Sequence, residues 1–212
     1  MSEALALDLH TVSLFILRWI HFLAGIVWIG ALYFFNLVNG PFARTMDGET
    51  KKKVVPQLMP RALWWFRWGA MVTVLSGYAY ILWKIFVATD AGLYGTGGLF
   101  NSTWGKWITM GTGLGTIMWF NVWFIIWPIQ KKLITGTKTG QPPANAEALT
   151  KRAFLASRLN TYLSVPLLFS MGAASHYPVF NTPTVLAALL GGFGIAWFFI
   201  EKVSGKAGAN FS

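Results

Sequence analysis

The first long apolar run, residues 12–38, constrains the fold of this chain more than any other feature. It reads VSLFILRWIHFLAGIVWIGALYFFNLV. As an α-helix, about 27 residues would extend about 40 Å, which is enough to cross a bilayer with some tilt. Arg18 and His21 lie inside the run. Ionisable side chains are costly in hydrocarbon and mark functional sites, so the run predicts a transmembrane helix with a functional histidine.

Four more apolar runs follow, each close to the ~20 residues that a span needs. They cover residues 63–86, 107–129, 157–179 and 183–200. The connections between them are polar or rich in Gly and Pro, and neither a repeat of fixed period nor a domain boundary is visible. We therefore expect an all-α integral membrane protein in which residues 1–212 form a single domain, a bundle of five transmembrane helices.

Composition excludes a soluble domain and several kinds of cofactor site. Hydrophobic residues make up 55% of the chain and charged residues 11%, with a mean hydropathy of +0.51. The first ten residues contain no Lys or Arg, so they lack the basic region of a signal peptide and the first helix is expected to be retained. Cysteine is absent, which excludes disulfides, thiolate metal sites and covalently attached c-type haem. Any cofactor would be held by His, Met or carboxylate groups.

The Lys and Arg residues predict the orientation in the membrane. In a five-helix topology, 14 of the 17 lie on one side, and only Arg18, Lys84 and Lys106 lie on or near the other. By the positive-inside rule, the N-terminus is outside and the C-terminus is cytoplasmic, in the cell inner (cytoplasmic) membrane. The net charge of +10 belongs to these connections, so nucleic acid is not an expected partner.

The histidines are the strongest candidates for cofactor ligands. Of the three in the chain, His10 precedes the hydrophobic core and is expected to be solvated or interfacial. Asn39 and Arg158 mark the inner ends of the helices that carry His21 and His176. In both helices the histidine is about 18 residues from that inner end, or about 27 Å. Because the two helices run antiparallel, the imidazoles are expected at similar depth, towards the outer leaflet.

A haem held by two histidines is what this pattern would build. Gly25 and Gly172 lie one turn deeper than the histidines, on the same faces, and leave room for a flat macrocycle. Arg18, one turn outward of His21, would supply a positive charge for a propionate. Two alternatives stay open: the glycines are helix-packing positions and His21 hydrogen-bonds across helices, or His21 and His176 hold a non-haem metal ion.

A second polar set lies in the inner halves of the predicted helices. Its members are Asn36, Arg67, Thr73, Asn121, Arg158 and Asn160. Such residues usually form hydrogen bonds between helices, which is the favoured prediction. The alternative is that they line a substrate or quinone pocket, or a proton path. Pro166 is expected to kink its helix and to free the carbonyl of Tyr162.

Four segments resemble the membrane domain of bacterial membrane-bound urate oxidases, the urate oxidase N-terminal domain family. They are HFLAGIVWIGALYFFNLVN (21–39), PRALWWFRWGAMVTVLSG (60–77), NVWFIIWPIQKKLI (121–134) and SRLNTYLSVPLLFSMGAASHYP (157–178). In the urate-oxidising members a cytochrome c domain follows; this chain has no CxxCH, so the resemblance implies a separate electron acceptor. A weaker similarity, an early histidine followed by the WxG that contains Trp28, links the chain to HemJ-type membrane haem proteins. This similarity adds Trp28 to the candidate cofactor-binding residues.

Three functions fit these observations. The preferred one is a b-type haem electron-transfer protein in the bilayer, a subunit or partner of a larger redox complex with cytochrome c or another redox subunit. The second is a membrane oxidoreductase that acts on urate or a related small molecule, and the third is a cofactor-free structural subunit. Electron transfer is preferred because it needs only the cofactor, whereas no carboxylate lies within the predicted spans and Glu201 is the nearest. No catalytic residue is predicted.

Overall fold

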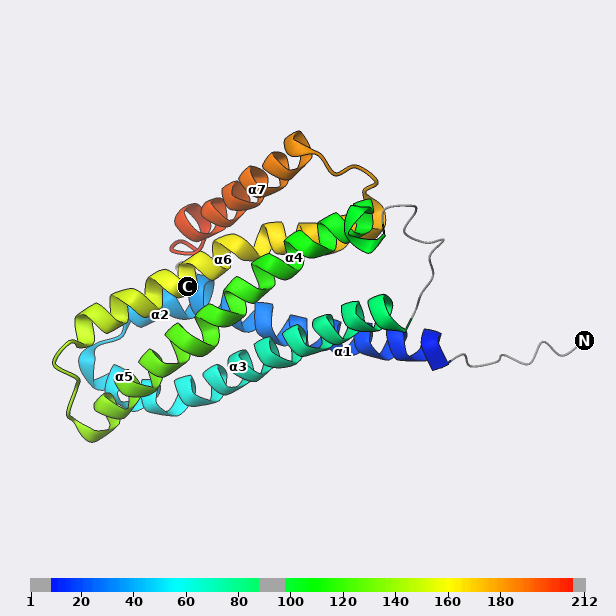
Figure 1. The fold of residues 1–212 in the computed structure, drawn as a ribbon. Coiled ribbons are helices and arrows are strands. Elements are labelled where there is room, and N and C mark those ends of the chain that lie inside the picture. The colour runs from blue at the N-terminus through cyan, green and yellow to red at the C-terminus, as the bar shows by residue number, and fades with distance from the viewer. Residues whose placement is uncertain (1–8, 88–97, 208–212) are drawn as a thin grey trace, which may run out of the picture.

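The computed structural model describes residues 9–87 and 98–207, and every regular element in these ranges is helical (Figure 1). The elements join into five continuous helices. The first comprises α1 (Leu9–Tyr33), the π-helical turn η1 (Phe34–Asn39) and α2 (Gly40–Thr45), and the second is α3 (Gly48–Phe86). This confirms the all-helical class and the presence of five helices.

The remaining helices follow in the predicted order. After a 3-10 turn, η3 (Leu99–Asn101), the third comprises α4 (Thr103–Phe120), η4 (Asn121–Ile126) and α5 (Trp127–Thr139). The fourth is α6 (Ala146–His176), and the fifth comprises α7 (Thr182–Trp197) and η5 (Phe198–Val203).

The helices extend beyond the apolar runs that predicted them. Asp47 caps α3 by accepting hydrogen bonds from the backbone N–H groups of Glu49 (2.8 Å) and Thr50 (3.0 Å). From there α3 continues through Pro56 and Pro60, so much of the predicted connection 39–62 is helical. Hydropathy detects only the apolar part of such a helix.

The fourth helix ends earlier than predicted. It stops at His176 instead of residue 179, and Tyr177 is extended with φ −129° and ψ 106°. The physical reason is Pro178, whose ring disfavours helical backbone at the residue before it. His176 is therefore the last residue of its helix.

Four of the five helices are long and apolar enough to cross a membrane, which indicates a multi-pass membrane protein. They are Leu9–Thr45, Gly48–Phe86, Thr103–Thr139 and Thr182–Val203. The helix α6 is more polar because it lies among the others: it packs against α1, α4, α5 and α7 and buries Asn160, Thr161, Ser164 and Ser170. Whether α6 also spans the bilayer stays a prediction.

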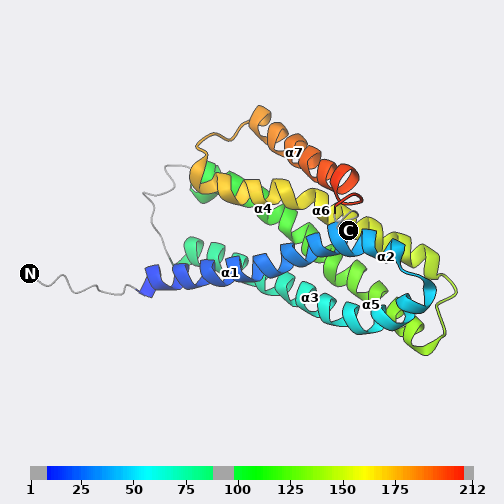
Figure 2. The ribbon, with the colours of Figure 1, turned by 180° about the vertical axis from the view of Figure 1, so that it is seen from behind.

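The helices pack as two antiparallel pairs. In Figures 1 and 2, α1 lies along α3 and α4 lies along α6, while α7 covers the other side of α6. At the crossing of α6 and α7, a Cβ on Gly192 would lie 2.6 Å from Cδ of Pro166, so only glycine allows this approach. The two pairs spread apart towards the ends where α1 begins and α6 ends. The main core, around Trp28, Phe66 and Met118, holds them together elsewhere.

Candidate functional site

His21 is held by the backbone of α3. Its Nδ1 lies 2.8 Å from the carbonyl oxygen of Thr73, and Oγ of Ser76 is 3.4 Å from the same nitrogen. A carbonyl oxygen only accepts, so Nδ1 carries the proton and donates it to Thr73. Nε2 is then left with a free lone pair. This is the arrangement found in metal-binding histidines, in which a hydrogen bond at one nitrogen fixes the tautomer and the ring orientation.

Gly77 makes room for this ring. A Cβ at Gly77 would lie 3.0 Å from Cε1 and 3.1 Å from Nδ1 of His21, tighter than ordinary van der Waals contact. Sequence reasoning missed both Thr73 and Gly77 as the neighbours that hold His21. The glycine within an apolar run was a visible signal, but nothing in the sequence says which residue of another helix faces it.

Arg18 is held by the same helix. Its Nη2 donates a hydrogen bond to the hydroxyl of Tyr80, and its Cζ lies 5.3 Å from the centre of the Tyr80 ring. Arg18 and His21 therefore both contact α3, with Tyr80 one turn beyond Ser76. The positive charge expected near His21 is present on this side of α1.

His176 has a different environment. It is exposed at the end of α6 and makes no hydrogen bond, ion pair or ring contact within residues 9–87 and 98–207. Its depth can be compared with that of His21 because Tyr33 Oη lies 3.0 Å from Ser164 Oγ, which sets the register of α1 against α6. Both histidines lie about 12 residues from this contact, towards the ends where α1 begins and α6 ends, or about 18 Å along each helix. The similar depth thus follows from the register, but the side chain of His21 is directed to α3.

The other predicted cofactor-binding residues lie in three settings. Gly25 faces α3, where its Cβ would meet Cγ2 of Thr73 at 3.9 Å, an ordinary contact. Gly172 is open, with nothing within 4 Å of an added Cβ. Trp28 is 1% exposed in the main core, and its Nε1 has no hydrogen-bond partner. His10 contacts α3 as well, accepting a hydrogen bond of 3.0 Å from Nε1 of Trp83.

Three members of the inner polar set, the asparagines, form the predicted hydrogen bonds between helices; Thr73 bonds within its own helix, Arg67 packs against indole rings and Arg158 pairs with Glu201. Asn36 in η1 donates to Oγ of Ser157 at 2.9 Å. Asn121, the first residue of η4, donates to Oδ1 of Asn160 at 2.8 Å, and Asn160 donates to the carbonyl of Met118 at 2.9 Å. Asn36 thus bonds the first helix to α6, and Asn121 and Asn160 bond the third helix to α6. π-Helical turns are often retained where a helix carries such a specific contact.

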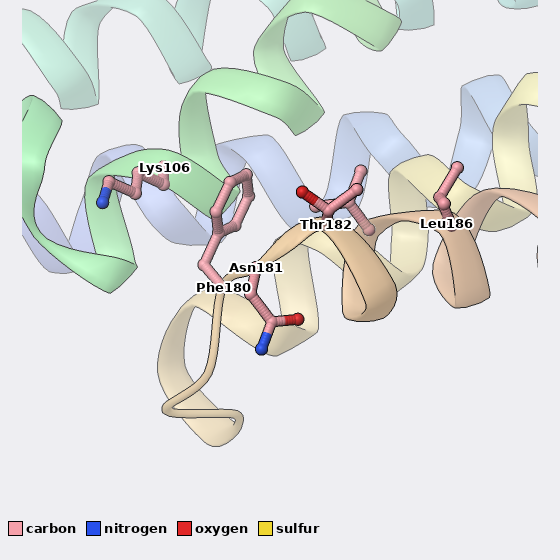
Figure 3. Close-up of a pocket in the computed structure, with 6 residues that line it drawn as sticks. Lys106, Phe180, Asn181, Thr182 and Leu186 are labelled. Atoms are coloured by element: carbon pink, nitrogen blue, oxygen red, sulfur yellow. The ribbon is translucent and has the colours of Figure 1, made fainter.

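Elsewhere, the described residues form no metal-binding cluster, and the hollow beside the start of α4 contains few polar side chains. Within the described residues, no group of three or more His, Asp or Glu side chains could hold a metal ion. An open hollow of about 440 Å³ lies between the start of α4 and the start of α7 (Figure 3). Lys106 is the charged residue in it, and Asn181 is already used to cap α7 through Thr184.

Comparison with known proteins adds the family. The model of the urate oxidase N-terminal family matches residues 85–211, which is more than half of the chain. The chain belongs to the urate oxidase N-terminal family. The matched region runs from the end of α3 to the C-terminus and includes His176. The resemblance of segments 21–39 and 60–77, which contain His21 and Thr73, lies outside it and stays a prediction. The comparisons found no match among curated proteins and none among solved structures.

Proposed function

We propose that this member of the urate oxidase N-terminal family binds haem b in the cytoplasmic membrane and transfers electrons as a subunit or partner of a larger redox complex. The observation that supports this most is the hydrogen bond from Nδ1 of His21 to the carbonyl of Thr73. It leaves Nε2 as a fixed lone pair inside a helix that is apolar enough to span a membrane. An ionisable side chain at such a position commonly marks a functional site.

The residues around His21 would suit it to hold the iron of a haem. Thr73 fixes the tautomer, Gly77 provides room for the ring, and Arg18 with Tyr80 places a positive charge one turn outward. His176 is the proposed second ligand; its assignment rests on equal depth and on ring nitrogens that have no partner in the described residues. A bound haem would supply one-electron oxidation and reduction. The chain's own residues would orient the haem and set its charge environment.

The proposed topology places five helices across the membrane, α6 included, with the N-terminus outside. It is supported by the 14 of 17 basic residues that would face the cytoplasm. A reporter fused after Ser212 is expected in the cytoplasm, and one inserted near Gly97 is expected outside. Recovery of both reporters on one side would contradict the five-helix count.

Family membership favours a second candidate function, oxidation of urate or a related small molecule. In that case the electrons would pass to a separate cytochrome c. Membranes that contain the chain would then reduce added cytochrome c only when urate is supplied. Cytochrome c reduction by a chemical donor but not by urate would favour electron transfer alone.

Absorption spectra of the purified protein, oxidised and dithionite-reduced, test the haem proposal. We expect a Soret band and the spectrum of low-spin, six-coordinate iron. His21→Ala should abolish the low-spin spectrum or remove the haem, and His176→Ala should give high-spin iron or lower occupancy. His10→Ala, the control, should leave the spectrum unchanged. A protein without a Soret band would leave only the structural role, and an unchanged spectrum in His176→Ala would assign the second ligand to another residue.

A further inference from the structure

Arg67 of α3 is packed among three indole rings and has no counter-ion in the part of the chain that the structure describes. Its Cζ lies 4.0 Å from the ring centre of Trp127, 5.0 Å from that of Trp123 and 5.5 Å from that of Trp68. Its Nε is buried and makes no hydrogen bond, and no carboxylate within the described residues pairs with Arg67. The aromatic faces stabilise the cation, but the N–H donors of the guanidinium remain available to an acceptor.

The position of Arg67 along the helix matches the edge of a bilayer. Phe86 ends α3 on the far side of the molecule from Arg67, and Trp107 lies near the start of α4, on the far side from Trp127. Each of these two pairs is separated by about 20 residues, or about 30 Å of helix, which is the thickness of the hydrocarbon region. The stacked pair Arg67 and Trp127 therefore lies near the level of the lipid phosphates on the basic side of the molecule.

A hollow continues from Trp127 towards the basic end. It measures about 800 Å³ and is formed by α5 and the connection that follows it, with Trp127, Lys131, Lys132 and Gln141 among its lining residues. The only ion pair within the described residues joins Arg158 and Glu201, 3.2 Å apart, so Lys131 and Lys132 have no carboxylate partner there. Trp127 therefore contacts Arg67 and also lines the hollow that contains Lys131 and Lys132.

We propose that this surface, Arg67 with Trp127, Lys131 and Lys132, binds the headgroup of an anionic phospholipid. A phosphodiester would accept hydrogen bonds from the guanidinium and attract both ammonium groups, as in the basic pockets at the cytoplasmic face of other membrane proteins. The nearby indoles are suited to the adjacent acyl and glycerol region, because Trp64, Trp65 and Trp68 are 48%, 60% and 40% exposed. Depth and exposed indoles together favour a lipid over a soluble anion.

Native mass spectrometry of the detergent-solubilised chain tests this proposal. Phosphatidylglycerol and cardiolipin are titrated against phosphatidylcholine. We expect saturable retention of the anionic lipids, and about five-fold weaker binding for each basic residue removed by Arg67→Gln, Lys131→Gln and Lys132→Gln. The matched control replaces Lys51, Lys52 and Lys53 by Gln on the polar extension of α3. It removes the same charge and should retain the lipid.

Two further arms distinguish the alternatives. Arg67→Lys keeps the charge but loses the planar group that stacks on Trp127, so it should also weaken binding; if Arg67→Gln does not fold, this variant and the two lysine replacements carry the test. Inorganic phosphate in excess should not displace the lipid. Equal binding of phosphatidylcholine, equal loss in the control, or displacement by free phosphate would each overturn the proposal.

Discussion

The two antiparallel helix pairs differ in how they hold their histidines: His21 is hydrogen-bonded to the neighbouring helix, whereas His176 is exposed. In the α1 and α3 pair, polar side chains of one helix bond to the other, His21 to the Thr73 carbonyl and Arg18 to Tyr80. In the outer half of the α4 and α6 pair the contacts are mostly apolar or aromatic: Trp107 packs against Phe169, and a Cβ on Gly111 would lie 2.7 Å from Cε of Met171. His176 takes no part in that packing.

The comparison shows that two residues at matching positions along their helices can have different surroundings. His21 and His176 are each 12 residues along their helices from the contact between Tyr33 and Ser164. Their surroundings differ because rotation about the helix axis decides which neighbour a side chain meets. His21 is oriented by its hydrogen bond to α3, whereas no contact among the described residues orients His176. Five replacements, with their controls, test how the helix pairs are held, from the largest expected effect to the smallest.

Gly77→Leu should have the largest effect because the new side chain occupies the place of the His21 ring. We expect most of the haem to be lost and the free energy of unfolding to fall by about 1–3 kcal/mol. The haem-to-protein ratio and thermal unfolding in detergent measure the two effects. Gly172→Leu is the control for stability alone, since its side chain enters open space.

Gly172→Leu also tests where a haem would lie. Gly172→Leu should leave the stability unchanged, so a loss of haem in that variant would place the macrocycle beside α6. Full haem occupancy in Gly77→Leu would show that His21 is not a ligand.

Asn160→Ala should lower the free energy of unfolding by about 1–3 kcal/mol, because Asn160 is fully buried and its loss leaves the side-chain amide nitrogen of Asn121 without its acceptor and removes one of the bonds to the Met118 carbonyl. Asn36→Ala removes one bond between the two pairs, to Ser157, and should cost about 1 kcal/mol. Thermal unfolding compares them. Equal losses would mean that the bonds within a pair and between the pairs matter equally.

Arg18→Leu should lower the midpoint potential of the haem, because removal of a nearby positive charge disfavours the added electron. A change on the order of 1 kcal/mol corresponds to about 40 mV for one electron. Tyr80→Phe, the control, frees Arg18 but keeps its charge and should shift the potential less. A redox titration with no shift in a folded, haem-loaded Arg18→Leu protein would assign Arg18 to contact with the outer interface.

Asp47→Asn should have the smallest effect, and the effect should depend on pH. Hydrogen bonds from the Thr50 hydroxyl, and then from backbone N–H groups, lower the pKa of Asp47 in the folded protein. Because the pKa of Asp47 is lower in the folded than in the unfolded protein, its ionised carboxylate stabilises the folded state at pH values above the unfolded-state pKa. This contribution is lost as the pH falls through the folded-state pKa. The difference in thermal stability between wild type and variant should therefore be present at neutral pH and vanish in acid. A difference independent of pH would contradict this.

The helices could be predicted from the sequence because an apolar run is a local property of the chain. A span needs about 20 apolar residues whatever its neighbours are, so all five helices were placed in the right order. The polar start of α3 was missed because hydropathy does not report helix outside the membrane. The end of α6 was misplaced by three residues because the effect of Pro178 on Tyr177 was overlooked.

The sequence by itself determined which residues are candidates, and the tertiary structure decided what each one meets. Counting residues gave the equal depth of His21 and His176, since the helical rise is constant. Counting could not predict the hydrogen bond of His21 to the Thr73 carbonyl, the close approach of Gly77 to His21, or the stacking of Arg67 on Trp127. Each of these contacts joins helices far apart in the sequence, and it depends on the rotation of each helix about its axis. That rotation is set by packing across the whole bundle.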